Sequence, residues 1–326
     1  MRTVSTNTPV ASLPRPSVTT AAPLKVPSAT PTSQTTWETV SLLVGSGQPG
    51  RLYAFQYDYA SPGILAGHAR LLVSDDNAAT WLLFPGGLPS GNAQCLHDVN
   101  LDYATRDSVF VSTCHGLEHW SGTRWEIISS KETVRVAIVY GDPKSIWAVT
   151  TTDPGLISRS GDGGATWIPA DGGTAVFGSI DALAIDPRGG KTLYAVRSSN
   201  CCGRALIRGT LAGEWIDLPA PVASGSGPFV TGLVIDGATG TLYVSATNAD
   251  HHGEIWKTLN PGEPDVNKII WTQVHDFGAQ FDVRLMAAGA GPAGAVLYAA
   301  VENYPSPITT ERSADGGQTW LRLKIP

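Results

Sequence analysis

One octapeptide pattern, Ser-x-Asp-x-Gly-x-Thr-Trp, occurs twice in the chain and constrains its fold more than any other feature. The full copies are 160–167 and 313–320, and a third copy, 74–81, has Ala in place of the Gly. The Ser and Asp side chains can accept hydrogen bonds from the amides of a tight turn, and glycine permits positive φ. We assign a structural turn role to Ser160, Asp162, Gly164, Thr166, Trp167, Ser313, Asp315, Gly317, Thr319 and Trp320. Such a widely spaced repeat predicts a modular array.

The tryptophan that closes the pattern recurs at intervals typical of one β-propeller blade. The series is Trp81, Trp125, Trp167, Trp215, Trp271 and Trp320, with gaps of 44, 42, 48, 56 and 49 residues. Before each Trp lie two short apolar runs joined by a turn, as in 180–186 and 192–196, and the second run usually carries an aromatic residue. These features predict an all-β, six-bladed β-propeller of four-stranded antiparallel blades with almost no helix. Trp37, 44 residues before Trp81, leaves a seventh blade open.

The octapeptide resembles the Asp-box, or BNR repeat, of sialidases, sortilin-type receptors, xyloglucanases and photosystem-assembly propellers. The resemblance runs from about Trp37 to the end of the chain. It implies a β-propeller in which the box is a structural turn on the face away from the ligand. Because enzymes, receptors and scaffolds share this repeat, it implies architecture more than activity.

Composition divides the chain into a linker and a propeller. Residues 1–36 are rich in Pro, Ser and Thr and hold three basic and no acidic residues, so we expect a disordered linker before a propeller at 37–326. The net charge of −6, less these three positive charges, leaves −9 for the propeller, which argues against nucleic-acid binding. We expect no membrane insertion within this chain, and we expect export to the cell envelope or outside the cell through an upstream segment or anchor.

The four cysteines bear on that location. If the turn of one predicted hairpin is centred between Asp102 and Asp107, Cys95 and Cys114 face each other across two antiparallel strands, within disulfide reach. Two buried thiols are the alternative. The adjacent Cys201 and Cys202 form either a vicinal disulfide or two thiols.

The face opposite the boxes is the expected ligand face, because long loops converge there on the central channel. The longest loops are expected at 57–70, 197–204, 248–254 and 302–308. The ligand-binding candidates on this face are Tyr57, Tyr59, His68, His97, His251, His252, Glu302 and Tyr304. No metal site is predicted, since no His-x-x-x-His or comparable spacing occurs, and no cofactor is expected.

Two functions from different classes compete. The first is a non-catalytic, exported propeller that binds a protein partner or a glycan on its loop face. The second is a divergent sialidase-like or other glycoside hydrolase, for which the candidates are Arg135, Arg284, Glu302, Tyr304 and Asp98. Sialidases carry an Arg-Ile-Pro or Arg-Leu-Pro segment that this sequence lacks, so the binding function is favoured.

Overall fold

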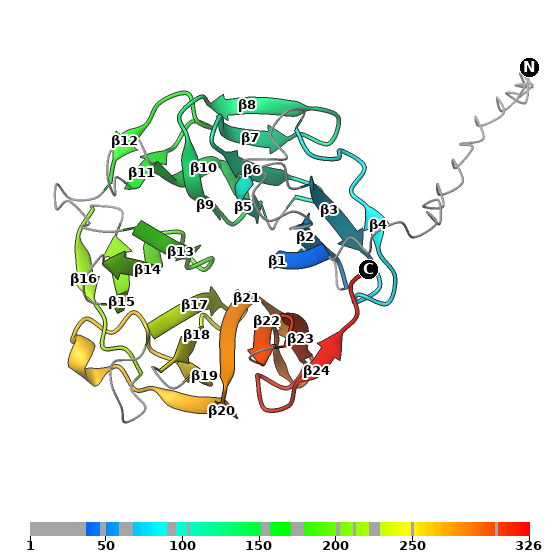
Figure 1. Ribbon diagram of the computed structural model, residues 1–326. Coiled ribbons are helices and arrows are strands. Elements are labelled where there is room, and N and C mark those ends of the chain that lie inside the picture. Colours follow the sequence, from blue (N-terminus) through cyan, green and yellow to red (C-terminus); the bar gives the residue numbers. More distant parts are fainter. Residues whose placement is uncertain are drawn as a thin grey trace, which may run out of the picture. The chain divides into compact units, whose positions relative to one another are not determined.

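The chain folds as a six-bladed β-propeller (Figure 1). The structure is a computed structural model, and it describes residues 37–45, 50–58, 68–89, 96–102, 105–150, 157–170, 179–199, 203–210, 213–221, 229–248, 251–303 and 306–326. Within these ranges, every sheet has four antiparallel strands that follow one another in the chain. The predicted fold class is confirmed.

Each blade runs from an inner strand at the centre of the ring to an outer strand at its rim. Blades 1 and 2 comprise β1 (Trp37–Val44), β2 (Leu52–Asp58), β3 (His68–Ser74), β4 (Leu82–Leu83), β5 (Leu96–Leu101), β6 (Val109–Thr113), β7 (Gly116–Trp120) and β8 (Trp125–Ser129). Blades 3 and 4 comprise β9 (Thr133–Val139), β10 (Asp142–Thr150), β11 (Ile157–Ser160), β12 (Ile168–Pro169), β13 (Ser179–Ile185), β14 (Thr192–Ser199), β15 (Gly203–Thr210) and β16 (Trp215–Asp217). Blades 5 and 6 comprise β17 (Phe229–Ile235), β18 (Leu242–Thr247), β19 (His252–Thr258), β20 (Thr272–Ala279), β21 (Phe281–Gly291), β22 (Gly294–Asn303), β23 (Thr309–Ser313) and β24 (Leu321–Leu323).

The predicted periodicity is reproduced strand by strand. Each of the six serial tryptophans lies at, or directly before, the start of an outer strand. Trp37 begins β1, the inner strand of blade 1, so the described strands form no seventh blade. Among the described residues, the only helix is the three-residue 3₁₀ turn η1 (Val266–Lys268).

The second strand of every blade carries a buried aromatic residue at an equivalent place, and β2 carries a second one, Phe55. The equivalent residues are Tyr53, Phe110, Trp147, Tyr194, Tyr243 and Tyr298, and each is at most 5% exposed. Both faces of such a strand are covered, since the neighbouring blades lie on either side, and β6 and β18 are buried along their whole length. Six apolar clusters form the core, one at each junction between neighbouring blades.

The octapeptides form the predicted turns. In 160–167, the Gly164 amide donates to Ser160 Oγ at 2.8 Å, and the Thr166 amide and Oγ1 donate to the Asp162 carboxylate at 2.9 and 2.6 Å. Gly163 and Gly164 have φ values of 77° and 93°. The copies at 313–320 and 74–81 repeat the pattern, although in the latter Asn77 and Ala78 adopt positive φ without being glycine.

Five of the six serial tryptophans use their indole N–H in one of two ways, whereas the Trp81 Nε1 has no hydrogen-bond partner among the described residues. With a full box, Trp167 and Trp320 donate to the carbonyl of the glycine three residues earlier, each at 2.9 Å. Where the acid of the box is missing or the box is interrupted, the indole donates to the preceding blade instead. These bonds join Trp125 to Gly86, Trp215 to Ala170 and Trp271 to Pro219, at 3.0, 3.0 and 2.8 Å. These three repeats thus replace a turn contact with a contact between blades.

The ring closes without strand exchange among the described residues. Blade 1 contains only strands from one end of the propeller sequence and blade 6 only strands from the other. The closing junction is an apolar cluster in which Leu42 and Leu52 of blade 1 pack with Val296 and Tyr298 of blade 6. Closure therefore depends on side-chain packing.

One part of the cysteine prediction can be checked. Leu96 pairs with Thr113 across β5 and β6, which is the register expected next to Cys95 and Cys114. Cys114 is disulfide-bonded. Cys95, Cys201 and Cys202 lie outside the described residues, so the pairings themselves remain predictions. The same holds for the linker at 1–36, which is also outside the described ranges.

The box aspartates should make stability depend on acid pH. Hydrogen bonds from the Thr166 hydroxyl and amide, and then from Ser160, lower the pKa of Asp162 to about 2, and the equivalent bonds lower the pKa of Asp315. An Asp in the unfolded chain titrates near 3.9. A lowered folded pKa adds stability that is complete above pH ~4 and is lost as the pH falls toward ~2.

We therefore expect Asp162→Asn to flatten the fall in unfolding free energy between pH 4 and pH 2. Denaturant titrations at a series of pH values measure it. Asp217→Asn, which changes an exposed acid outside the boxes, serves as the control. Parallel curves for the wild type and Asp162→Asn would contradict this account of the turn.

Candidate functional site

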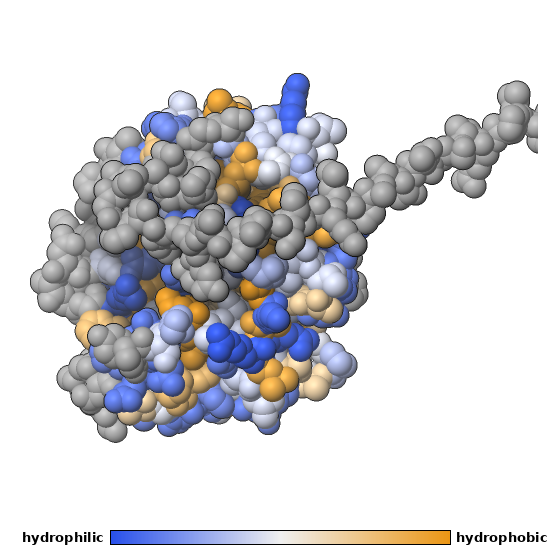
Figure 2. All heavy atoms as spheres, turned by 45° about the vertical axis from the view of Figure 1, so that its right-hand side comes forward, coloured by the Kyte–Doolittle hydropathy of each residue, from blue (hydrophilic) through white to orange (hydrophobic). Residues whose placement is uncertain are grey.

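The face where the inner strands begin is the candidate binding face, and we call it the loop face. It contains the first residues of β1, β5, β9, β13, β17 and β21, together with the last residues of the second strands and the first residues of the third strands. The box turns lie at the other ends of the strands, as the sequence predicts. Figure 2 shows one side of the molecule, where hydrophilic residues alternate with small apolar patches.

The strands reach further toward the loop face than predicted. Tyr57 lies within β2, paired with Glu38 and Ala69, and its ring packs edge-on against Phe55 with centroids 6.3 Å apart. The expectation that Tyr57 and His252 lie in loops is wrong, since His252 begins β19, and Glu302 likewise belongs to β22. Polar residues at strand ends look like loop residues in a sequence, but the backbone ladder continues through them.

The other candidates are placed as follows. His97 and Asp98 lie in β5, Arg135 lies in β9, and Arg284 lies in β21, all near the loop face. His68 begins β3, and His251 directly precedes β19. Tyr59 and Tyr304 lie outside the described residues.

A β-bulge in the inner strands shapes this face. The register shifts at Val40 in β1, His97 in β5, Val134 in β9 and Asp181 in β13. A bulge removes one residue from the ladder, so its carbonyl needs another donor. The sequence gives no separate signal for these bulges.

Arg135 supplies that donor for three blades at once. Its Nε donates to the Asp181 carbonyl of blade 4 at 2.8 Å, and its NH1 donates to the His97 carbonyl of blade 2 at 3.3 Å. The same NH1 donates to the Val134 carbonyl at 2.6 Å. The guanidinium group therefore joins blades 2, 3 and 4 through their bulged residues.

Arg284 makes the equivalent contact where the ring closes. Its NH2 donates to the carbonyl of Val40, the bulged residue of β1, at 3.0 Å. The charge of Arg284 also acts on Glu38: burial raises the pKa of Glu38, Arg284 opposes that rise, and Glu302 adds to it. Arg284 thus helps to hold blade 6 against blade 1.

Asp98 bridges two blades with its carboxylate. Its Oδ1 accepts from the Val99 amide at 3.0 Å, and its Oδ2 accepts from the Val136 amide of blade 3 at 3.1 Å. Burial raises the pKa of Asp98, while Arg135 and the two amides act in the opposite direction. Both oxygens are engaged with backbone, so this carboxyl is held as a structural acceptor rather than aimed at a substrate.

Basic and acidic side chains surround these contacts and pair with one another. Arg204 pairs with Asp181 at 2.9 Å, and His97 lies 3.2 Å from Glu132. On blades 5 and 6, His251 Nδ1 lies 2.9 Å from Asp282, and His252 Nε2 lies 2.6 Å from Asp276. The described part of the loop face is therefore a charged surface with mixed signs.

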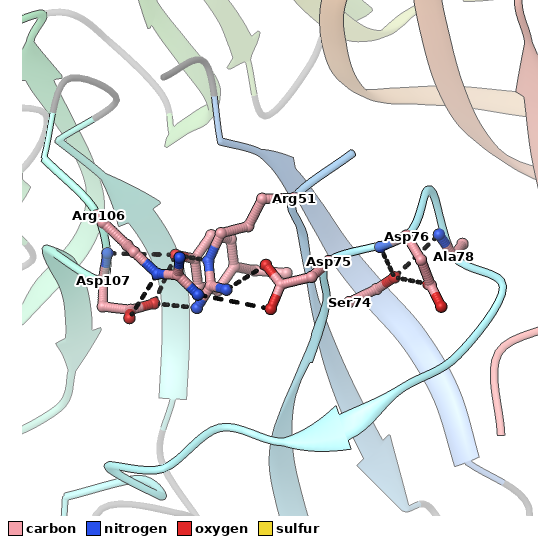
Figure 3. Close-up of polar contacts among 8 residues, drawn as sticks. Arg51, Ser74, Asp75, Asp76, Ala78, Arg106 and Asp107 are labelled. Atoms are coloured by element: carbon pink, nitrogen blue, oxygen red, sulfur yellow. Dashed lines mark hydrogen bonds and ion pairs between the residues drawn. The ribbon is translucent and has the colours of Figure 1, made fainter. Parts of the chain in front are cut away.

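A second polar cluster, missed by the sequence analysis, lies at the opposite ends of the strands (Figure 3). Arg51, only 4% exposed, pairs with Asp75 of blade 1 and Asp107 of blade 2, and its Nε donates to Tyr53 Oη at 2.8 Å. Arg106 lies 3.5 Å from Asp75 and 3.6 Å from Asp107, so two guanidinium groups balance two carboxylates. Burial is the main cause that raises the pKa of Tyr53 to about 12, and Asp107 adds to the rise. This balanced cluster joins blades 1 and 2.

Comparisons with known proteins agree on the fold. No protein-family model and no curated protein sequence matches this chain. The chain is similar to a GH74 xyloglucanase from Xanthomonas campestris, with 17% identity and a TM-score of 0.55 over 85% of this chain. It spans only 45% of that enzyme's length.

Two proteins of comparable size are also similar. YCF48 from Cyanidioschyzon merolae has 17% identity and a TM-score of 0.52, with 88% of this chain and 87% of that chain covered. A lectin from Burkholderia pseudomallei has 15% identity and a TM-score of 0.51, with 89% and 85% covered. At these identities the comparisons show a shared propeller fold. No helix in the described part of the chain has the length and apolar character of a membrane span.

Replacing Arg135 should weaken the whole ring. Arg135→Ala removes three hydrogen bonds from a charged donor, and we expect it to lower the unfolding free energy by about 2 kcal/mol. Arg204→Ala, which removes a half-exposed ion pair on the same face, should cost under about 1 kcal/mol. Denaturant unfolding compares the two. Equal losses would show that Arg135 does not join the blades.

Proposed function

We propose that this chain is a non-catalytic binding propeller that takes a protein partner on its loop face. The observation that carries the proposal is that the candidate catalytic residues are occupied in contacts between blades. Arg135, Arg284 and Asp98 each engage backbone groups of a neighbouring blade, which leaves them poorly suited to clamp or protonate a glycoside. Loop-face groups that contact no neighbouring backbone remain available for a ligand.

The chemistry of the surrounding rim favours a polypeptide. Arg197 and Arg204 are 31% and 41% exposed, and they lie on the same face as Glu132 and Asp282, which are 34% and 36% exposed. Mixed charges at this exposure can complement the charged and polar groups of a protein surface and select among partners. Recognition of neutral sugars relies more on exposed aromatic rings, and Tyr57 is instead half-buried in β2.

The fold comparison is compatible with binding as well as catalysis. A protein named as a lectin and YCF48 share this architecture over 85% and 87% of their own lengths, whereas the xyloglucanase is about twice as long as this chain. We also propose that the chain is exported, because Cys114 is disulfide-bonded and such bonds persist in oxidising compartments.

The test is a pair of charge-reversal variants. The loop-face variant carries Arg197→Glu and Arg204→Glu, and the control carries Arg124→Glu and Lys268→Glu at the box ends of blades 2 and 5, where the side chains are 77% and 71% exposed. Both change the net charge by the same amount. A partner captured from the native host is purified, and its Kd is measured with each variant.

We expect the loop-face variant to weaken binding at least tenfold and the control to bind like the wild type. Weakening by the control alone would place the partner on the other face. Binding on a glycan array with no protein partner would favour a lectin. Turnover of a glycoside panel by the wild type would show that the chain is an enzyme.

A further inference from the structure

Three potential metal ligands converge on blade 5, beside the loop face. His252 and Glu254 are two residues apart in β19, so their side chains point to the same side of the sheet. Asp276 of β20 pairs directly with Glu254. One ligand atom from each of the three residues lies within 4.8 Å of the other two.

The charges in this cluster are not balanced. Glu254 is 8% exposed, and its Oε2 accepts from Trp256 Nε1 at 2.8 Å. Among the described residues, no Lys or Arg forms an ion pair with Glu254, and the hydrogen bond to its carboxylate comes from the neutral indole of Trp256. A buried carboxylate without a cation is costly. The single imidazole of His252 lies against Asp276 at 2.6 Å and cannot neutralise two acids.

We propose that His252, Glu254 and Asp276 bind one divalent transition-metal ion, with Zn²⁺ as the best match. Zinc takes imidazole nitrogen and carboxylate oxygen at about 2.0–2.2 Å, and three protein ligands leave a fourth position open. Ca²⁺ and Mg²⁺ prefer oxygen ligands alone, so the imidazole disfavours them. The ion supplies the positive charge that the buried Glu254 lacks.

The second ligand shell and a nearby histidine refine the assignment. The Gly278 amide donates to Asp276 Oδ1 at 2.7 Å and orients that carboxylate toward the site. The neighbouring pair of His251 and Asp282 has the same two side-chain types at 2.9 Å. It belongs to no such group of three among the described residues, which makes it a matched control.

This site goes beyond the proposed partner binding and beyond the sequence expectation of no metal. A His-x-Glu pair is informative only on a strand, where alternate residues share a face. The third ligand depends on the register between β19 and β20, which contains bulges. Neither feature can be read from spacing.

The experiment is isothermal titration of Zn²⁺ into the full chain after EDTA treatment and desalting. We expect one zinc ion per chain with a micromolar Kd. Glu254→Gln changes a buried group but keeps an acceptor for Trp256, whereas Asp276→Asn changes a half-exposed group and should disturb the fold less. The two variants therefore separate loss of the metal ligand from loss of the fold. Each should weaken binding at least tenfold, whereas Asp282→Asn should leave the Kd unchanged.

Cobalt substitution gives a second measurement. Co²⁺ bound to the wild type should show visible d–d absorption that both ligand variants lose while their circular dichroism spectra remain native. Zinc binding in wild type that is no tighter than in Glu254→Gln and Asp276→Asn would overturn the proposal. Loss of binding in Asp282→Asn equal to that in Glu254→Gln would also overturn it.

Discussion

Every sheet of this propeller is complete within one blade, so contacts between side chains and neighbouring backbone hold the ring together. In the described residues no strand is shared between blades, not even where blade 1 meets blade 6. Six apolar clusters supply the non-directional part of that cohesion. Burial of this kind is favourable but does not fix the angle between blades. Hydrogen bonds that cross the junctions fix the orientation of each blade relative to its neighbour.

Those directional bonds include two sets at opposite ends of the strands. At the box ends, the indole groups of Trp125, Trp215 and Trp271 donate to the preceding blade where the local box has decayed. At the loop face, bulged carbonyls accept from Arg135 and Arg284. A charged donor makes a stronger hydrogen bond than a neutral one, and a planar guanidinium group can reach several carbonyls at once. The same arginines are therefore poor candidates for binding a substrate.

The sequence predicts the blade count, the strand order and the box turns because all three depend on local periodicity. Trp81 to Trp320 mark the outer strands, and the paired apolar runs mark the inner ones. The candidate face was also predictable, since His97, Asp98 and Arg135 lie there as expected. Their roles were not predictable. A bulge is a register property of two strands, and the Arg51 cluster joins positions 51, 75 and 107, whose proximity depends on how blade 2 packs against blade 1.

The exchange rate of the Arg135 Nε–H proton tests the central claim most directly. Nitrogen-15 NMR can compare this proton with that of the exposed Arg322, because a hydrogen bond held in a native junction slows exchange with water. If Arg135 joins three blades, its Nε–H should exchange at least tenfold more slowly than that of Arg322 under native conditions. Equal exchange rates would mean that the guanidinium group is free in solution, and the account of Arg135 as a structural contact between blades would be wrong.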